Sequence, residues 1–114
     1  MLTLYHTTNA AEVILTSGFR NGVGSYGLAT LELRGVFLAD CPVDCNEGAI
    51  GDQVLAVVLP DDVDLSDYEL VDELKTYREW CVPAELINRH GQLRLLSEDD
   101  VDAACRDWRA ARGR

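Results

Sequence analysis

The stretch QVLAVVLP, residues 53–60, decides how this sequence is interpreted. It is continuously apolar, rich in β-branched valine and stopped by a proline. That composition is typical of a buried strand, and the run is far shorter than the roughly 20 apolar residues of a membrane-spanning helix. We therefore predict a buried strand here.

The segments on either side predict further strands and short helices. LTLYH, residues 2–6, alternates as a strand does. A short helix is predicted over AAEVILTS, residues 10–17, opened by a capping box at Asn9 and closed by Gly18. Later strands are predicted at GVFLAD (35–40), YELV (68–71), EWCV (79–82) and QLRLL (92–96).

Two helical segments complete the pattern near the C-terminus. PAELI, residues 83–87, predicts a turn of helix started by proline, and Ser97 is expected to cap a last helix. Residues 19–34 are rich in glycine and aperiodic, so we predict a long loop there. The order of strand, helix, several strands and terminal helix predicts an α+β fold with a mainly antiparallel sheet. At 114 residues we expect a single domain over 1–114.

Charge and cysteine content limit the classes of function. The formal net charge of −10 argues against generic duplex nucleic-acid or anionic-membrane binding. The first residues, MLTLYHTT, lack the basic and apolar regions of a signal peptide. The four cysteines form no CxxC pair and, with only two histidines in the chain, predict reduced thiols rather than a metal site. We therefore expect a cytoplasmic protein without a metal.

Three residues are candidates for chemistry: His6, Phe37 and Glu79. Each also has an ordinary structural interpretation. A histidine at a strand end often makes a structural hydrogen bond, a phenylalanine in a short strand is usually in the core, and a glutamate opening a strand usually faces solvent. Only their order along the chain favours a functional interpretation.

Four stretches in order resemble the ADP-ribosyltransferase superfamily. They are YHTT (5–8), ILTSGF (14–19), GVFLAD (35–40) and YREWCV (77–82). The resemblance is to the branch with a His–Tyr–Glu arrangement, which includes poly(ADP-ribose) polymerases and small bacterial relatives, and it spans residues 2–88. It implies a compact fold with a split, mainly antiparallel sheet, an early short helix and a C-terminal helix. It also implies an NAD-dependent enzyme that transfers single ADP-ribose units or hydrolyses NAD.

The resemblance assigns a role to each matching residue. Glu79 would be the catalytic carboxylate at the ribose, stabilising the oxocarbenium-like species that forms when the nicotinamide–ribose bond breaks. His6, counted with Glu79 among the catalytic residues, would donate a hydrogen bond to a ribose hydroxyl, and the backbone of Thr7 would hold the nicotinamide amide. Phe37 would stack on the nicotinamide ring. Tyr26 would close over the same ring.

The sequence departs from the family pattern in several places. Thr7 replaces the usual glycine and Phe37 the commoner tyrosine, and residues 41–51 lack the second stacking tyrosine, which is why Tyr26 is considered. Tyr77 stands where arginine-modifying relatives carry an acid or amide, so arginine is a less favoured acceptor. The acceptor is open among a protein, a nucleic-acid base and a small molecule, and a toxin-like role with a cognate antidote protein is open as well.

Two alternatives stay open. The first is an RNA 2′-phosphotransferase-like enzyme, which also uses NAD but relies on several arginines; only Arg20, Arg34 and Arg78 lie between His6 and Glu79. The second is a catalytically silent module that binds NAD, ADP-ribose or a protein.

Overall fold

The computed structural model describes residues 1–26, 31–42, 52–71 and 76–112, and the side chains of 23–26, 31, 32 and 112 lie outside this description. Within it the strands are β1 (Leu2–Thr8), β2 (Gly22–Tyr26), β3 (Leu31–Ala39), β4 (Gln53–Leu59), β5 (Glu69–Leu70), β6 (Glu79–Val82) and β7 (Gln92–Leu95). The helices are α1 (Ala11–Ser17), α2 (Ala84–His90) and α3 (Glu98–Arg112), with a 3₁₀ turn η2 (Ser66–Tyr68).

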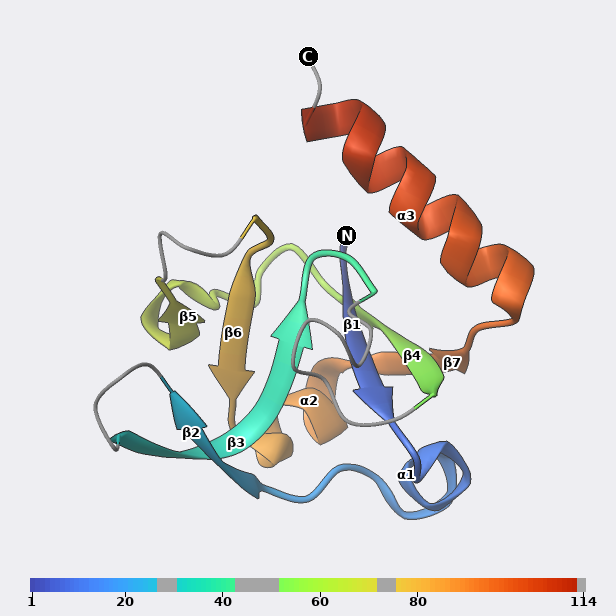
Figure 1. The fold of residues 1–114 in the computed structure, drawn as a ribbon. Helices are drawn as coiled ribbons and strands as arrows, with labels where there is room; N and C mark the ends of the chain where they lie inside the picture. Colours follow the sequence, from blue (N-terminus) through green and yellow to red (C-terminus); the bar gives the residue numbers. More distant parts are fainter. Residues whose placement is uncertain (27–30, 43–51, 72–75, 113–114) are drawn as a thin grey trace.

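The strands form one antiparallel sheet in the order β5-β6-β3-β1-β4-β7, with β2 paired to β3 (Figure 1). The α+β prediction is confirmed. β4, the predicted buried strand, lies beside β1 near one side of the sheet and has five buried residues among its seven. No helix within the described ranges is long and apolar enough to cross a membrane.

The prediction of a long loop over residues 19–34 is wrong. β2 pairs with the first half of β3, from Gly22 opposite Gly35 to Tyr26 opposite Leu31. The glycine-rich composition hid this hairpin, because a two-stranded ladder is held by backbone hydrogen bonds and needs no alternation of apolar side chains. The intervening residues 27–30 lie outside the described residues.

The start of α1 also differs from the prediction. The N-cap position is Ala10, and Asn9 instead accepts a hydrogen bond from the backbone N–H of Asp52 at 3.2 Å. The side chain of Asn9 therefore connects β1 to the start of β4 rather than capping the helix. The other caps are confirmed: Gly18 ends α1 with φ 83°, and the Ser97 hydroxyl accepts from the backbone N–H of Asp100 at 3.1 Å.

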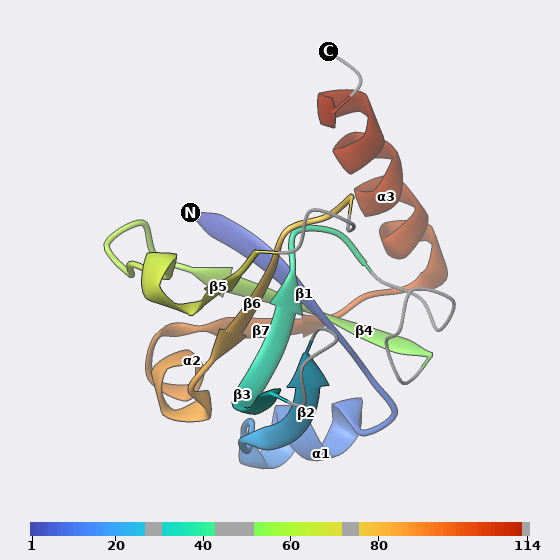
Figure 2. The same cartoon turned by 60° about the vertical axis from the view of Figure 1, so that its left-hand side comes forward.

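Alternation along the strands gives the sheet two different faces. The first, which we call the core face, carries Leu4, Leu38, Leu55, Trp80 and Val82, all buried in one cluster with residues of α1 and α2. The second, the Glu79 face, carries Tyr5, Phe37, Ala39, Glu79 and Cys81. A smaller cluster of Val54, Ala56 and Leu96, with Val101 of α3, packs on part of the second face. In Figures 1 and 2, α3 extends away from the side of the sheet where α1 and α2 lie.

Candidate functional site

Glu79 is the first residue of β6 and lies in the interior of the sheet. Its backbone is opposite Ala39 of β3 on one side and Leu70 of β5 on the other. Its side chain is half-buried, whereas Trp80 and Val82 on either side of Cys81 are buried. The carboxylate therefore belongs to the Glu79 face, as predicted from the alternation of EWCV.

Phe37 lies on the same face, one diagonal step from Glu79. It is directly opposite Cys81, and Cys81 shares a face with Glu79 because the two are separated by one residue. Diagonal neighbours of this kind have Cα atoms about 7–8 Å apart, within reach of an aromatic side chain. The structure thus brings together the two residues that the sequence predicted as the stacking platform and the catalytic carboxylate.

His6 lies on the other face of the sheet. It is opposite Leu55 in β4, and its ring contacts the core residue Phe19 edge-on, with ring centroids 5.0 Å apart. Its side chain is half-buried, and Nδ1 lies 2.8 Å from the backbone carbonyl oxygen of Phe37. The structure therefore joins His6 to the backbone of Phe37, but alternation does not place its side chain beside Glu79.

The bond from His6 to Phe37 forms where β1 and β3 separate. The recorded pairing between these strands is Tyr5 opposite Ala39, and the strands diverge beyond it (Figure 1). The imidazole of His6 thus links β1 to β3 just beyond the Tyr5–Ala39 pair, where the two strands begin to diverge.

The same bond fixes which nitrogen of His6 carries the proton. A carbonyl oxygen only accepts, so Nδ1 is the donor. Burial lowers the pKa of His6, an effect that the hydrogen bond to Phe37 partly opposes. A neutral ring with its proton on Nδ1 offers a ligand an acceptor at Nε2. His6 would then accept from a ribose hydroxyl, and would donate to it only when protonated.

Thr7 and Tyr26 complete the predicted site. Thr7 is half-buried, lies opposite Val54 in β4, and by alternation shares the Glu79 face with Tyr5. Tyr26 is the last residue of β2, with its backbone opposite Leu31. Its side chain lies outside the described residues, so its predicted contact with nicotinamide stays a prediction.

Two residues of the Glu79 face had no role in the sequence prediction. Cys81 lies opposite Phe37 and two residues along β6 from Glu79, and burial, with the Glu79 carboxylate nearby, raises the pKa of its thiol. Tyr5 lies in the same cross-strand row as Ala39 and Glu79, and burial raises the pKa of its hydroxyl despite the nearby Arg94. The alternation of LTLYH would have identified Tyr5, because it sets this residue on the face opposite to His6.

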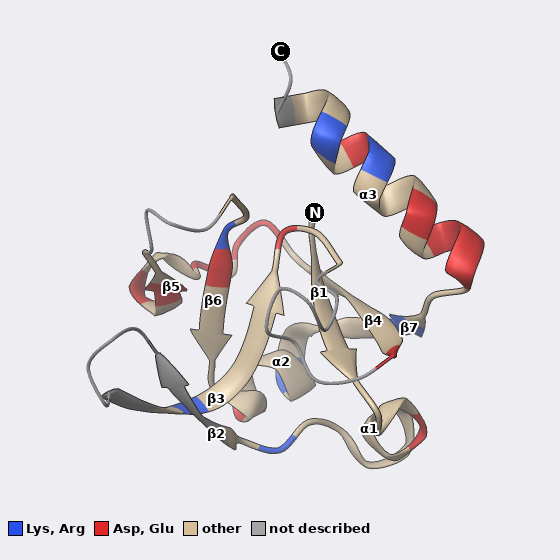
Figure 3. Ribbon diagram, viewed as in Figure 1, with Lys and Arg blue, Asp and Glu red and all other residues tan. Residues whose placement is uncertain are grey.

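Acidic residues occur in several separate parts of the described molecule (Figure 3). Figure 3 shows acidic residues on the first turns of α3 and near β5 and the start of β6. Arg78, Arg89 and Arg94 each form an ion pair with a carboxylate. The described residues contain no group of three or more His, Cys, Asp or Glu placed to hold a metal ion.

A groove of about 290 Å³ lies elsewhere, beside α2. It is lined by Tyr68, Pro83, Glu85, Leu86, Arg89 and His90. None of these is a predicted site residue, and we assign the groove no role.

Comparison with known proteins adds no relative. No protein-family model, curated protein or solved structure matches this chain. The functional interpretation therefore depends on the residues and their geometry alone.

Proposed function

We propose that this chain is an NAD-dependent mono-ADP-ribosyltransferase with an ADP-ribosyltransferase-like fold. It would cleave the nicotinamide–ribose bond and transfer ADP-ribose to an acceptor, with hydrolysis of NAD as a side or main reaction. The observation that carries the proposal is the register of β3 and β6, in which Phe37 and Glu79 share one face as diagonal neighbours.

The proposed chemistry needs a carboxylate and a flat apolar surface at this spacing. NAD bound with its nicotinamide ring on Phe37 would present the adjoining ribose towards Glu79. The carboxylate would accept hydrogen bonds from the ribose hydroxyls and stabilise positive charge as the bond breaks. It would also orient or deprotonate the acceptor.

His6 and Thr7 would position NAD for the reaction. Nε2 of a neutral His6 would accept from a ribose hydroxyl, while the backbone of Thr7 would bind the nicotinamide amide. This role requires NAD to reach Nε2 of His6, whose ring lies against Phe19 on the core face.

The test is release of nicotinamide from NAD by the wild-type protein, with Glu79→Gln as the matched variant. We expect release by the wild type and a fall of about 10²- to 10⁴-fold in the variant. Calorimetry should show that Glu79→Gln still binds NAD, because the amide keeps the shape of the carboxylate. Equal rates in the two proteins, or no release by either, would contradict the proposal.

A second candidate is a silent module that binds NAD or ADP-ribose without turnover. The position of His6 on the core face favours it, because a ribose ligand is then less easily shared by His6 and Glu79. Binding of NAD by the wild type without release of nicotinamide would support this alternative.

A further inference from the structure

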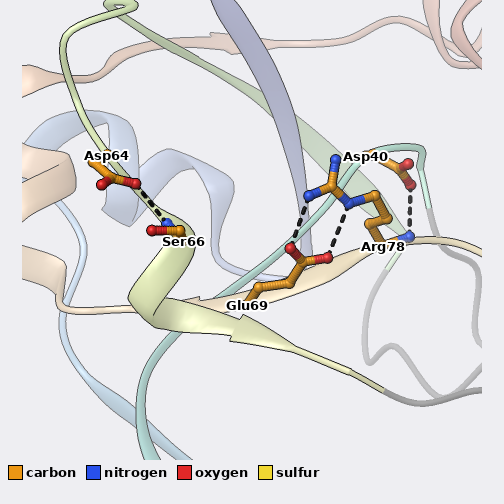
Figure 4. Close-up of polar contacts among 5 residues, drawn as sticks. All are labelled: Asp40, Asp64, Ser66, Glu69 and Arg78. Carbon is orange, nitrogen blue, oxygen red and sulfur yellow. Dashed lines mark hydrogen bonds and ion pairs between the residues drawn. The ribbon is translucent and has the colours of Figure 1, made fainter.

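Arg78, the residue before Glu79, is hydrogen-bonded to β3 through its backbone (Figure 4). Its N–H donates to Oδ1 of Asp40 at 3.0 Å, and its carbonyl oxygen accepts from the Asp40 N–H at 3.1 Å. Asp40 directly follows Ala39, the residue opposite Glu79. The strand is therefore fixed to β3 just before Glu79.

The side chain of Arg78 makes a second connection, to β5. Nε donates to one carboxylate oxygen of Glu69 at 2.9 Å, and a terminal nitrogen donates to the other at 2.7 Å (Figure 4). Such two-pronged arginine–carboxylate pairs are stronger and more directional than single contacts. The guanidinium also lies 4.9 Å from the centre of the Trp80 ring. Glu69 is itself opposite Trp80, so the ion pair between Arg78 and Glu69 holds β5 against β6.

We propose that Asp40, Arg78 and Glu69 form a clamp that positions the Glu79 carboxylate for its reaction. The inference rests on the proposed function. β6 has only four residues, and Glu79 is its first. The clamp fixes the residue before it to β3 on one side and to β5 on the other. A shift of about 1 Å in a reacting group can cost 10²-fold in rate, so this position needs such support.

A purely stabilising role fits the exposure of the pair less well. The side chains of Arg78 and Glu69 are 61% and 25% exposed. Exposed ion pairs contribute little to the free energy of unfolding. The clamp should therefore affect the rate constant of the reaction more than the stability of the protein.

The first test compares Glu69→Gln with Glu85→Gln. Glu85 forms a similar single-charge pair with Arg89 on α2, at 3.1 Å and more exposed, so it is a matched control. We expect Glu69→Gln to lower kcat for nicotinamide release about 10-fold, with KM for NAD and the urea midpoint unchanged. Arg78→Lys keeps the positive charge but loses the paired hydrogen bonds to both carboxylate oxygens of Glu69, and it should behave in the same way. Glu85→Gln should change none of these quantities.

Unchanged kcat in Glu69→Gln and Arg78→Lys would overturn the clamp. A loss of kcat that follows a matching loss of stability would also overturn it, because the role would then be structural only.

A second measurement separates failure of the clamp from failure of the proposed function. Amide hydrogen exchange at Glu79 and Trp80, followed by NMR, needs no catalysis. We expect faster exchange at both amides in Glu69→Gln than in the wild type or Glu85→Gln. Exchange that does not change would overturn the clamp even in an inactive protein. A wild type that releases no nicotinamide, with faster exchange in the variant, would overturn the function and leave the clamp supported.

Discussion

The two faces of the sheet are built from the same strands but differ in how deeply their side chains are buried. On the core face, Leu4, Leu38 and Val82 are almost completely buried under α1 and α2. On the Glu79 face, the neighbouring residues Tyr5, Phe37 and Cys81 are only half-buried. Because successive side chains of a strand point to opposite faces, one set of residues can supply packing while the next supplies reactive groups. Glu79 is therefore only half-buried, although Trp80 and Val82 of the same strand are buried.

The largest expected difference between the faces is in stability, between the adjacent residues Trp80 and Cys81. Trp80 is 4% exposed and packs in the main core, whereas Cys81 is half-buried on the other face. We expect Trp80→Ala to lower the free energy of unfolding by about 3–5 kcal/mol, because a large cavity replaces the ring. Cys81→Ala should cost about 1 kcal/mol or less. Urea denaturation measures both, and similar losses would show that the two faces are packed alike.

A smaller effect is expected at Gly18, the residue that ends α1, one of the two helices packed on the core face. Gly18 has φ 83° and ψ 175°, a conformation that side chains disfavour. A Cβ there would lie 2.9 Å from the Oδ1 atom of Asn88. Asn88 cannot easily move, since it accepts from the N–H of Phe19 at 2.8 Å and donates to its carbonyl at 2.9 Å. We expect Gly18→Ala to destabilise the protein by about 1–3 kcal/mol.

The control for this prediction is Gly22→Ala, measured in the same urea titration. A Cβ at Gly22 would lie 3.6 Å from the carbonyl oxygen of Gly35, which is an ordinary contact. A cost at Gly22 equal to that at Gly18 would show that strain and the contact with Asn88 do not decide the effect.

The sequence predicted best where the side-chain pattern alone determines the structure. The apolar run of β4 and the alternation of EWCV in β6 gave both strands and the correct face for Glu79. The diagonal relation of Phe37 to Glu79 was not predictable, because it depends on the register between two strands about 40 residues apart in the chain. Only the pairing of Phe37 with Cys81 establishes it.

The sequence predicted less well where backbone or long-range hydrogen bonds decide. The hairpin of β2 and β3 was missed because glycine-rich strands show no alternation. Asn9 has the right residue type for a cap, but a bond to Asp52, distant in sequence, uses its side chain. His6 was expected at the end of the first strand, yet its bond to the carbonyl of Phe37 depends on how β1 and β3 separate. Such partners are set by the fold and leave no local pattern.

The proposed stacking role of Phe37 tests the Glu79 face through affinity. Aromatic stacking adds about 0.5–1.5 kcal/mol beyond the area buried. We expect Phe37→Ala to weaken NAD binding about 2- to 10-fold by calorimetry, and Phe37→Tyr, which keeps the ring, to bind like the wild type. Equal affinity in all three proteins would remove Phe37 from the proposed site and weaken the functional interpretation of the whole face.

The smallest expected effect concerns His6, a half-buried polar residue on the core face. Burial lowers its pKa below the ordinary value of 6.5, so the folded protein keeps the ring neutral where the unfolded chain is already protonated. The unfolded state then binds more protons, and the free energy of unfolding falls as the pH decreases from about 6.5 to the folded pKa. The slope from one such group is at most about 1.4 kcal/mol per pH unit, and the hydrogen bond to Phe37 reduces it.

Urea titrations between about pH 5 and 8 should show this slope in the wild type and a shallower one in His6→Gln. Every other ionisable group is common to both proteins, so the remaining contributions cancel in the difference. Identical slopes would mean that His6 is as well solvated in the folded state as in the unfolded one, and would move it from the core face to the surface of the proposed site.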